Sequence, residues 1–201
     1  MADWNVAWEP SAIEFSPVFD TRVTEYGGGV MQYASKRANP AYRFLLHFNM
    51  KHMEPADLHA IRAFFIARKG MYEGFTFPNF AENIRGEGLA LVAKVGEAAA
   101  YLTDSASGIL TAGFRASGKV TIYGSATGGN NKVCDVSGTT GPAAGTLTLA
   151  ADETLTADSA NANLRIYNTY DVHFANDELW QSSVNRSIGI FKTIELYAEA
   201  Y

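Results

Sequence analysis

Apolar and polar residues alternate over many short stretches of this chain. Successive side chains of a β-strand point to opposite faces, so this alternation predicts strands with one buried face. Clusters rich in glycine, asparagine and serine separate the stretches, as they do at turns. The predicted strands cover residues 42–50, 118–123, 132–136, 145–150 and 164–167, and a long closing strand covers residues 188–201 with a bulge near Phe191.

A β-hairpin is predicted over residues 19–33, around the triplet Gly27, Gly28 and Gly29. Glycine adopts the positive φ of a tight turn without a steric penalty. A further strand is predicted over residues 72–77, and Pro78 is expected to end it because proline has no N–H for the strand ladder.

Residues 55–69 follow a helical period instead. Pro55 suits the first helical position, where its missing N–H is not needed, and Gly70 suits the C-terminal stop. Spacings of three and four residues place apolar side chains on one face, which predicts a helix that packs against a sheet. The apolar stripe consists of Leu58, Ile61, Phe64 and Phe65.

The amino-acid composition of the chain changes twice along its length. Residues 1–88 and 168–201 are rich in aromatic side chains, whereas residues 89–167 are poorer in them and rich in Gly, Ala, Ser and Thr. We therefore predict a discontinuous domain formed by 1–88 plus 168–201, with residues 89–167 inserted as a small β module. The fold class is mainly β (α+β): a split β-sandwich or open barrel with one flanking helix.

The charge and the cysteine content narrow the function classes. The formal net charge is −5, which gives no overall electrostatic support for binding a polyanion. No apolar run approaches the roughly 20 residues that a membrane-spanning helix needs, so no membrane insertion is expected. Cys134 is the single cysteine and excludes an internal disulfide. These features are typical of a protein made and kept in the cytosol.

A phosphate-binding motif is suggested by the spacing of residues 113–119, from Gly113 to Gly118 and Lys119. That motif needs a Ser or Thr after the lysine to hold magnesium, and a helix that begins at once. Val120 follows the lysine here, and the next residues are β-branched and aromatic, which favours a strand. We therefore interpret this stretch as a hairpin turn.

Other candidate chemistry lacks the necessary spacing. The histidines, His47, His52, His59 and His173, have no arrangement diagnostic of a metal site. Ser125 lacks the glycine two places before it that a serine-hydrolase elbow requires, and Cys134 lies within a predicted strand. Asp152, Glu153 and Asp158 could form a glycosidase dyad but have no flanking aromatic residues. We predict no catalytic, cofactor-binding or metal-binding residues and no enzymatic activity.

Opposite charges gather in two parts of the chain. Residues 36–69 carry seven Lys or Arg against two acids, a balance of 7 − 2 = +5, and residues 171–199 carry five acids against two bases, a balance of 2 − 5 = −3. Two solvated faces explain this distribution, and so do complementary surfaces of neighbouring subunits in a head-to-tail ring.

Several segments together resemble a known family. Residues 19–32, then 43–48, the helix end at 64–70 and the aromatic stretch 72–78 occur in the order seen in phage minor tail proteins, and residues 185–199 resemble the last strand of those proteins. The chain is similar to the lambda-type minor tail protein M and to the distal tail proteins of siphophages and gene transfer agents.

That resemblance implies a tail-tube-like β-sandwich with a flanking helix, assembled as a ring at the distal end of a tail. The ring is hexameric by that resemblance, and its partners are the tail tube protein and the tail tip or hub proteins. DNA only passes through the channel, and the protein resides in the virion at the tail tip after assembly in the host cytoplasm. The family contributes no catalytic residues.

Two alternatives remain open at this point. The insert resembles small β modules of several phage tail proteins, so a receptor- or glycan-binding tail protein is the second hypothesis, and exposed aromatic side chains on the insert would favour it. A tail-associated cell-wall hydrolase is the third, and it requires polar groups clustered in a cleft.

Overall fold

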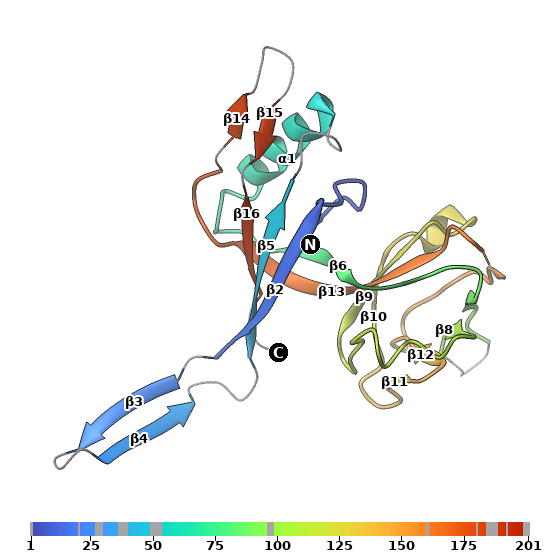
Figure 1. Cartoon of the computed structure of the whole chain (residues 1–201). Helices are drawn as coiled ribbons and strands as arrows, with labels where there is room; N and C mark the ends of the chain where they lie inside the picture. Colours follow the sequence, from blue (N-terminus) through green and yellow to red (C-terminus); the bar gives the residue numbers. More distant parts are fainter. Residues whose placement is uncertain are drawn as a thin grey trace. The chain divides into compact units, whose positions relative to one another are not determined.

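The computed structural model describes residues 2–19, 21–26, 30–35, 40–48, 54–95, 99–159, 161–179, 181–183, 189–191 and 193–198. Within these ranges the chain is mainly β, with α1 (Pro55–Ala67) as its α-helix and a short 3-10 turn, η1 (Gly128–Asn130) (Figure 1). The predicted mainly β, α+β fold class with one helix is confirmed. The finer likeness to a tail tube stays a prediction.

The chain folds into two compact units. Unit 1 comprises Met1–Ala2, Trp8–Phe75 and Asp171–Tyr201, and unit 2 comprises Asp3–Ala7 and Thr76–Tyr170. The long segment of unit 2 thus starts after Phe75 and ends at Tyr170. The composition alone placed the corresponding boundaries after residues 88 and 167.

Unit 1 contains an antiparallel sheet in the order β13, β16, β5, β2. Here β2 is Ala12–Val18, β5 is Ala41–His47, β16 is Ile194–Ala198, and β13 (Arg165–Phe174) contributes its C-terminal end. Alternate residues of β5 and β16 are buried, so one face of the sheet forms the core.

Helix α1 belongs to unit 1 and buries the side chains of Leu58 and Ile61. The ring of Phe64 packs edge-on against Phe75 and Trp8, with ring centroids 5.0 and 5.8 Å away. The predicted buried stripe is confirmed for Leu58 and Ile61, whereas Phe64 and Phe65 are half-buried. The helix ends at Ala67, two residues before the predicted end, and the residues that follow form turns.

Two small sheets complete the described part of unit 1. Strands β3 (Thr21–Tyr26) and β4 (Val30–Ser35) form the predicted hairpin, whose three glycines lie outside the described residues. Strands β14 (Gln181–Ser183) and β15 (Gly189–Phe191) form the second hairpin. The prediction of one closing strand over 188–201 is wrong: β15 pairs with β14, whereas β16 pairs with β5 and β13, so the pairing partner changes between them.

Unit 2 is a β structure built from two sheets around one core. The first contains β6 (Phe75–Arg85), the N-terminal part of β13, β9 (Lys119–Tyr123) and β10 (Val133–Asp135), with β1 (Ala2–Asp3) beside β6. The second contains β7 (Leu89–Val92), β8 (Tyr101–Asp104), β12 (Thr146–Thr148) and β11 (Pro142–Ala143). Side chains from both sheets, such as Leu102 and Ile122, share one buried cluster, as in a β-sandwich.

The predicted strand at 72–77 is wrong in both of its bounds. Residues after the helix form a turn, and β6 begins only at Phe75 and continues through Pro78 to Arg85. Proline removes one N–H donor but still fits an extended backbone, so it interrupts the ladder at one position without ending the strand. Every side chain from Phe75 to Phe80 is buried, which holds this strand in place.

Candidate assembly surface

The described histidines named for possible metal chemistry lie on three different elements, β5, α1 and β13. His47 Nε2 lies 2.9 Å from Glu14 Oε1 across β2 and β5, and His173 Nδ1 lies 3.2 Å from the Met71 carbonyl. His59 is exposed on α1, and His52 is outside the described residues. Across the described ranges no group of three or more His, Cys, Asp or Glu side chains could hold a metal ion.

The phosphate-loop spacing does not build a phosphate-binding loop. Gly113 has φ +82°, a conformation that favours glycine, and a Cβ added there would lie 3.1 Å from Glu82 Oε1, so that side chain would have to shift. A second turn closes with the hydrogen bond from the Gly118 N–H to the Arg115 carbonyl, and β9 begins directly at Lys119. The predicted strand after the turn is confirmed, and no helix follows to present its N–H groups.

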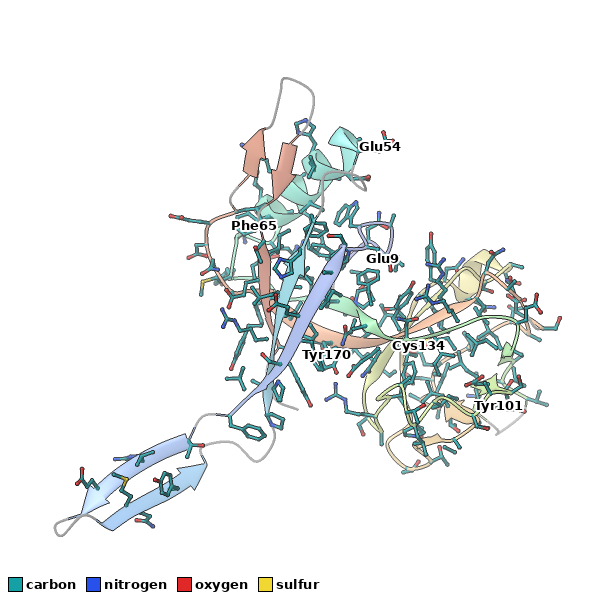
Figure 2. The ribbon with its side chains drawn as sticks, viewed as in Figure 1. Glu9, Glu54, Phe65, Tyr101, Cys134 and Tyr170 are labelled. Atoms are coloured by element: carbon teal, nitrogen blue, oxygen red, sulfur yellow. The ribbon has the colours of Figure 1, made fainter. Side chains whose placement is uncertain are left out.

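Cys134 is buried in the core of unit 2 (Figure 2). Burial is the main cause that raises the pKa of its thiol to about 12. The reactive species of cysteine is the thiolate, which is scarce at neutral pH for such a group. The side chain therefore acts as a small apolar core residue.

Ser125 belongs to a polar cluster that joins two loops of unit 2. Its Oγ donates to Asp158 Oδ2 at 2.6 Å and accepts from Asn130 Nδ2 at 3.1 Å. Asn130 is buried and also bonds both backbone groups of Thr156, at 2.8 and 2.9 Å. Asp158 and Thr156 tie the loop around Ser125 and Asn130 to residues 156–158, so hydrogen bonding within the fold accounts for these polar side chains.

Two of the acidic residues considered for a glycosidase dyad, Glu153 and Asp158, have different partners. Glu153 accepts from Lys132 Nζ at 2.8 Å and from the Asp135 N–H at 3.0 Å. Burial alone would raise the pKa of Glu153, but these hydrogen bonds outweigh it and lower the pKa. Asp158 instead binds Ser125, whose hydroxyl is the main cause that lowers the pKa of that carboxyl. Both carboxylates are therefore held as structural anions, not as an acid–base pair.

One more carboxylate cluster was not anticipated from the sequence. Glu82 Oε2 accepts hydrogen bonds of 2.7 Å from both the Tyr170 hydroxyl and Asn168 Nδ2. Asn168 also donates to the Gly113 carbonyl at 3.0 Å, and the Arg115 guanidinium lies 4.5 Å from the centre of the Tyr170 ring. Tyr170 is buried, so this cluster fastens the loop at 113–115 to β6 and β13.

A hollow of about 480 Å³ opens on unit 1. Phe65 of α1 (Figure 2) and Phe174 of β13 line it, with their ring centroids 4.8 Å apart. Its remaining lining residues are Asn176, Asp177, Glu178, Leu179, Thr193, Ile194 and Glu195. Asp177 Oδ1 accepts from the Met71 N–H at 3.1 Å, and Glu195 forms an ion pair with Arg43, so two of the three carboxylates have partners inside the chain.

The two charged stretches also interact within one chain. The Arg43–Glu195 ion pair joins the basic stretch to the acidic one. Arg68 and Lys69 lie 3.3 and 2.8 Å from the carboxylate of Glu73. Opposite charges of the described residues are thus partly compensated internally, which weakens the argument for complementary faces of neighbouring subunits.

The β3–β4 hairpin presents an apolar face to solvent. Val23 pairs directly with Tyr33, and Glu25 pairs with Met31, so Val23, Tyr33 and Met31 lie on the same face, together with Glu25. Their exposed fractions are 53, 66 and 52%. Isolated two-stranded hairpins are marginal in water, so an apolar face of this kind is typical of a surface that another chain covers. We call this face, formed by Val23, Met31 and Tyr33, the hairpin face.

The strand that precedes the hairpin is a sheet edge. Strand β2 pairs with β5 over all seven of its residues and is the last strand in the order, with no described strand on its other side. The outer N–H and C=O groups of an edge strand can pair with another chain. Edge and hairpin face are consecutive in the sequence. The edge was missed because β2 was not predicted, and the face because it depends on the register of the predicted hairpin.

No family model matches the chain, and no curated protein matches its sequence. In the part of the chain that the structure describes, no helix is long and apolar enough to cross a membrane.

Proposed function

We propose that this chain is a structural subunit that assembles with copies of itself into a closed ring at the distal end of a phage-type tail. The ring joins the tail tube to the tip or hub proteins, and DNA passes through its channel without being bound. The phage tail assignment rests on the sequence resemblance, in particular on the helix end at 64–70 followed by the aromatic stretch 72–78.

The observation that carries the assembly part of the proposal is the exposed hairpin face next to the outer edge of β2, beside which no described strand lies. A ring of identical subunits needs a heterologous contact, in which one surface of a subunit meets a different surface of the next. A strand edge can supply main-chain hydrogen bonds to a neighbouring subunit, and an apolar face can supply buried area.

Enzymatic activity is not part of the proposal. Of the residues singled out from the sequence, Ser125, Glu153 and Asp158 have structural partners, Cys134 is buried, and Asp152 is exposed. A structural role accounts for these polar groups with fewer assumptions than a hydrolase.

The receptor- or glycan-binding alternative receives less support. Between residues 89 and 167, the described aromatic side chain that is exposed is Tyr123, at 42%. Tyr101 is half-buried, and Phe114 and Tyr167 are buried. One exposed ring does not form a platform of several stacked aromatics on which sugars could lie.

The assembly proposal is tested with a hairpin variant. Met31→Ser combined with Tyr33→Ser removes apolar area from exposed positions, so the fold should persist while self-association weakens. Tyr123→Ser is the matched control because it removes an exposed ring from unit 2. Light scattering across a concentration series, with and without tail partners, should show oligomers for the wild type and the control and fewer for the hairpin variant.

Equal assembly of the hairpin variant and the wild type would contradict the role of the hairpin face. A wild-type chain that stays monomeric even with tail tube and tip proteins would contradict the ring itself. Circular dichroism of each variant separates these outcomes from simple unfolding.

A further inference from the structure

We draw no further inference here: the strongest candidate, the acid-rimmed hollow over Phe65 and Phe174 in unit 1, carries nothing because two of its three carboxylates already bind within the chain and nothing in the structure shows what fills it.

Discussion

Truncation of Ile61 measures whether helix α1 is held by its buried stripe. The side chain of Ile61 is 0% exposed, whereas Arg62, the next residue, is exposed. Ile→Ala at a fully buried site costs about 2–5 kcal/mol, from the lost transfer free energy and from the cavity left behind. Whole domains are stable by only about 5–15 kcal/mol, so the loss is a large fraction of the total.

The magnitude translates into a measurable shift in denaturation. With a urea dependence of about 2 kcal/mol/M, a loss of about 3 kcal/mol lowers the urea midpoint by about 1.5 M. Trp8 is a natural reporter because its ring contacts Phe64 of the helix at a centroid distance of 5.8 Å. Tryptophan fluorescence in a urea titration should therefore follow the loss of helix packing.

Two further variants make the helix experiment decisive. Arg62→Ala should change the free energy of unfolding by less than about 0.5 kcal/mol, as surface substitutions usually do. Phe65→Ala should fall between the two, because Phe65 is only half-buried although its ring contacts Phe174 at 4.8 Å. Equal effects of Ile61→Ala and Arg62→Ala would refute the assignment of the buried face.

Three other predictions concern turns and titratable groups. Gly70→Ala should destabilise the protein by at least about 1–2 kcal/mol and lower its melting temperature, because φ is +62° and the new Cβ would lie 2.7 Å from a carboxylate oxygen. Gly128→Ala, which has open space at its Cβ, should change the melting temperature little. Equal effects of the two substitutions would contradict this account. Cys134 should resist a thiol reagent at pH 8 until the protein is unfolded in urea, and rapid labelling of the native protein would show that the thiol is accessible. The folded-state pKa of Asp158 is lowered, so its stabilising contribution is present above its unfolded pKa of about 3.9 and is lost as pH falls through the folded value. Asp158→Asn should therefore make the free energy of unfolding fall less steeply in acid. Acid unfolding that is the same in the variant and the wild type would count against this account.

The fold class could be predicted because the periodicity of the sequence is strong where one face is buried. The helix over residues 55–67 and the strands around Val120 and Cys134 are found within two residues of their predicted bounds. The error at Pro78 arose because a local rule for proline was applied to a strand whose six consecutive buried residues outweigh the missing donor. Strand β2 was missed although Ile13 and Phe15 alternate with exposed neighbours, because the alternation covers only a few residues and none of its side chains is fully buried.

The hydrogen-bond cluster around Glu82 was harder to predict because it joins distant parts of the chain. Glu82 accepts hydrogen bonds from Asn168 and Tyr170, which are more than eighty residues away in the sequence, and no local sequence pattern predicts such a contact. The hairpin face is different. The alternation of Val23 with polar neighbours, and the apolar residues at 31 and 33, were visible in the sequence, but only the strand register shows that they share one face.

Electron microscopy of purified tail particles, with the chain located by a gold-labelled antibody, tests the central claim most directly. The account predicts label at the distal end of the tail, and a closed ring of density there that is missing from particles assembled without the chain. Label spread along the tail or absent from the particles, together with a chain that never forms rings in solution, would contradict the proposed architectural role.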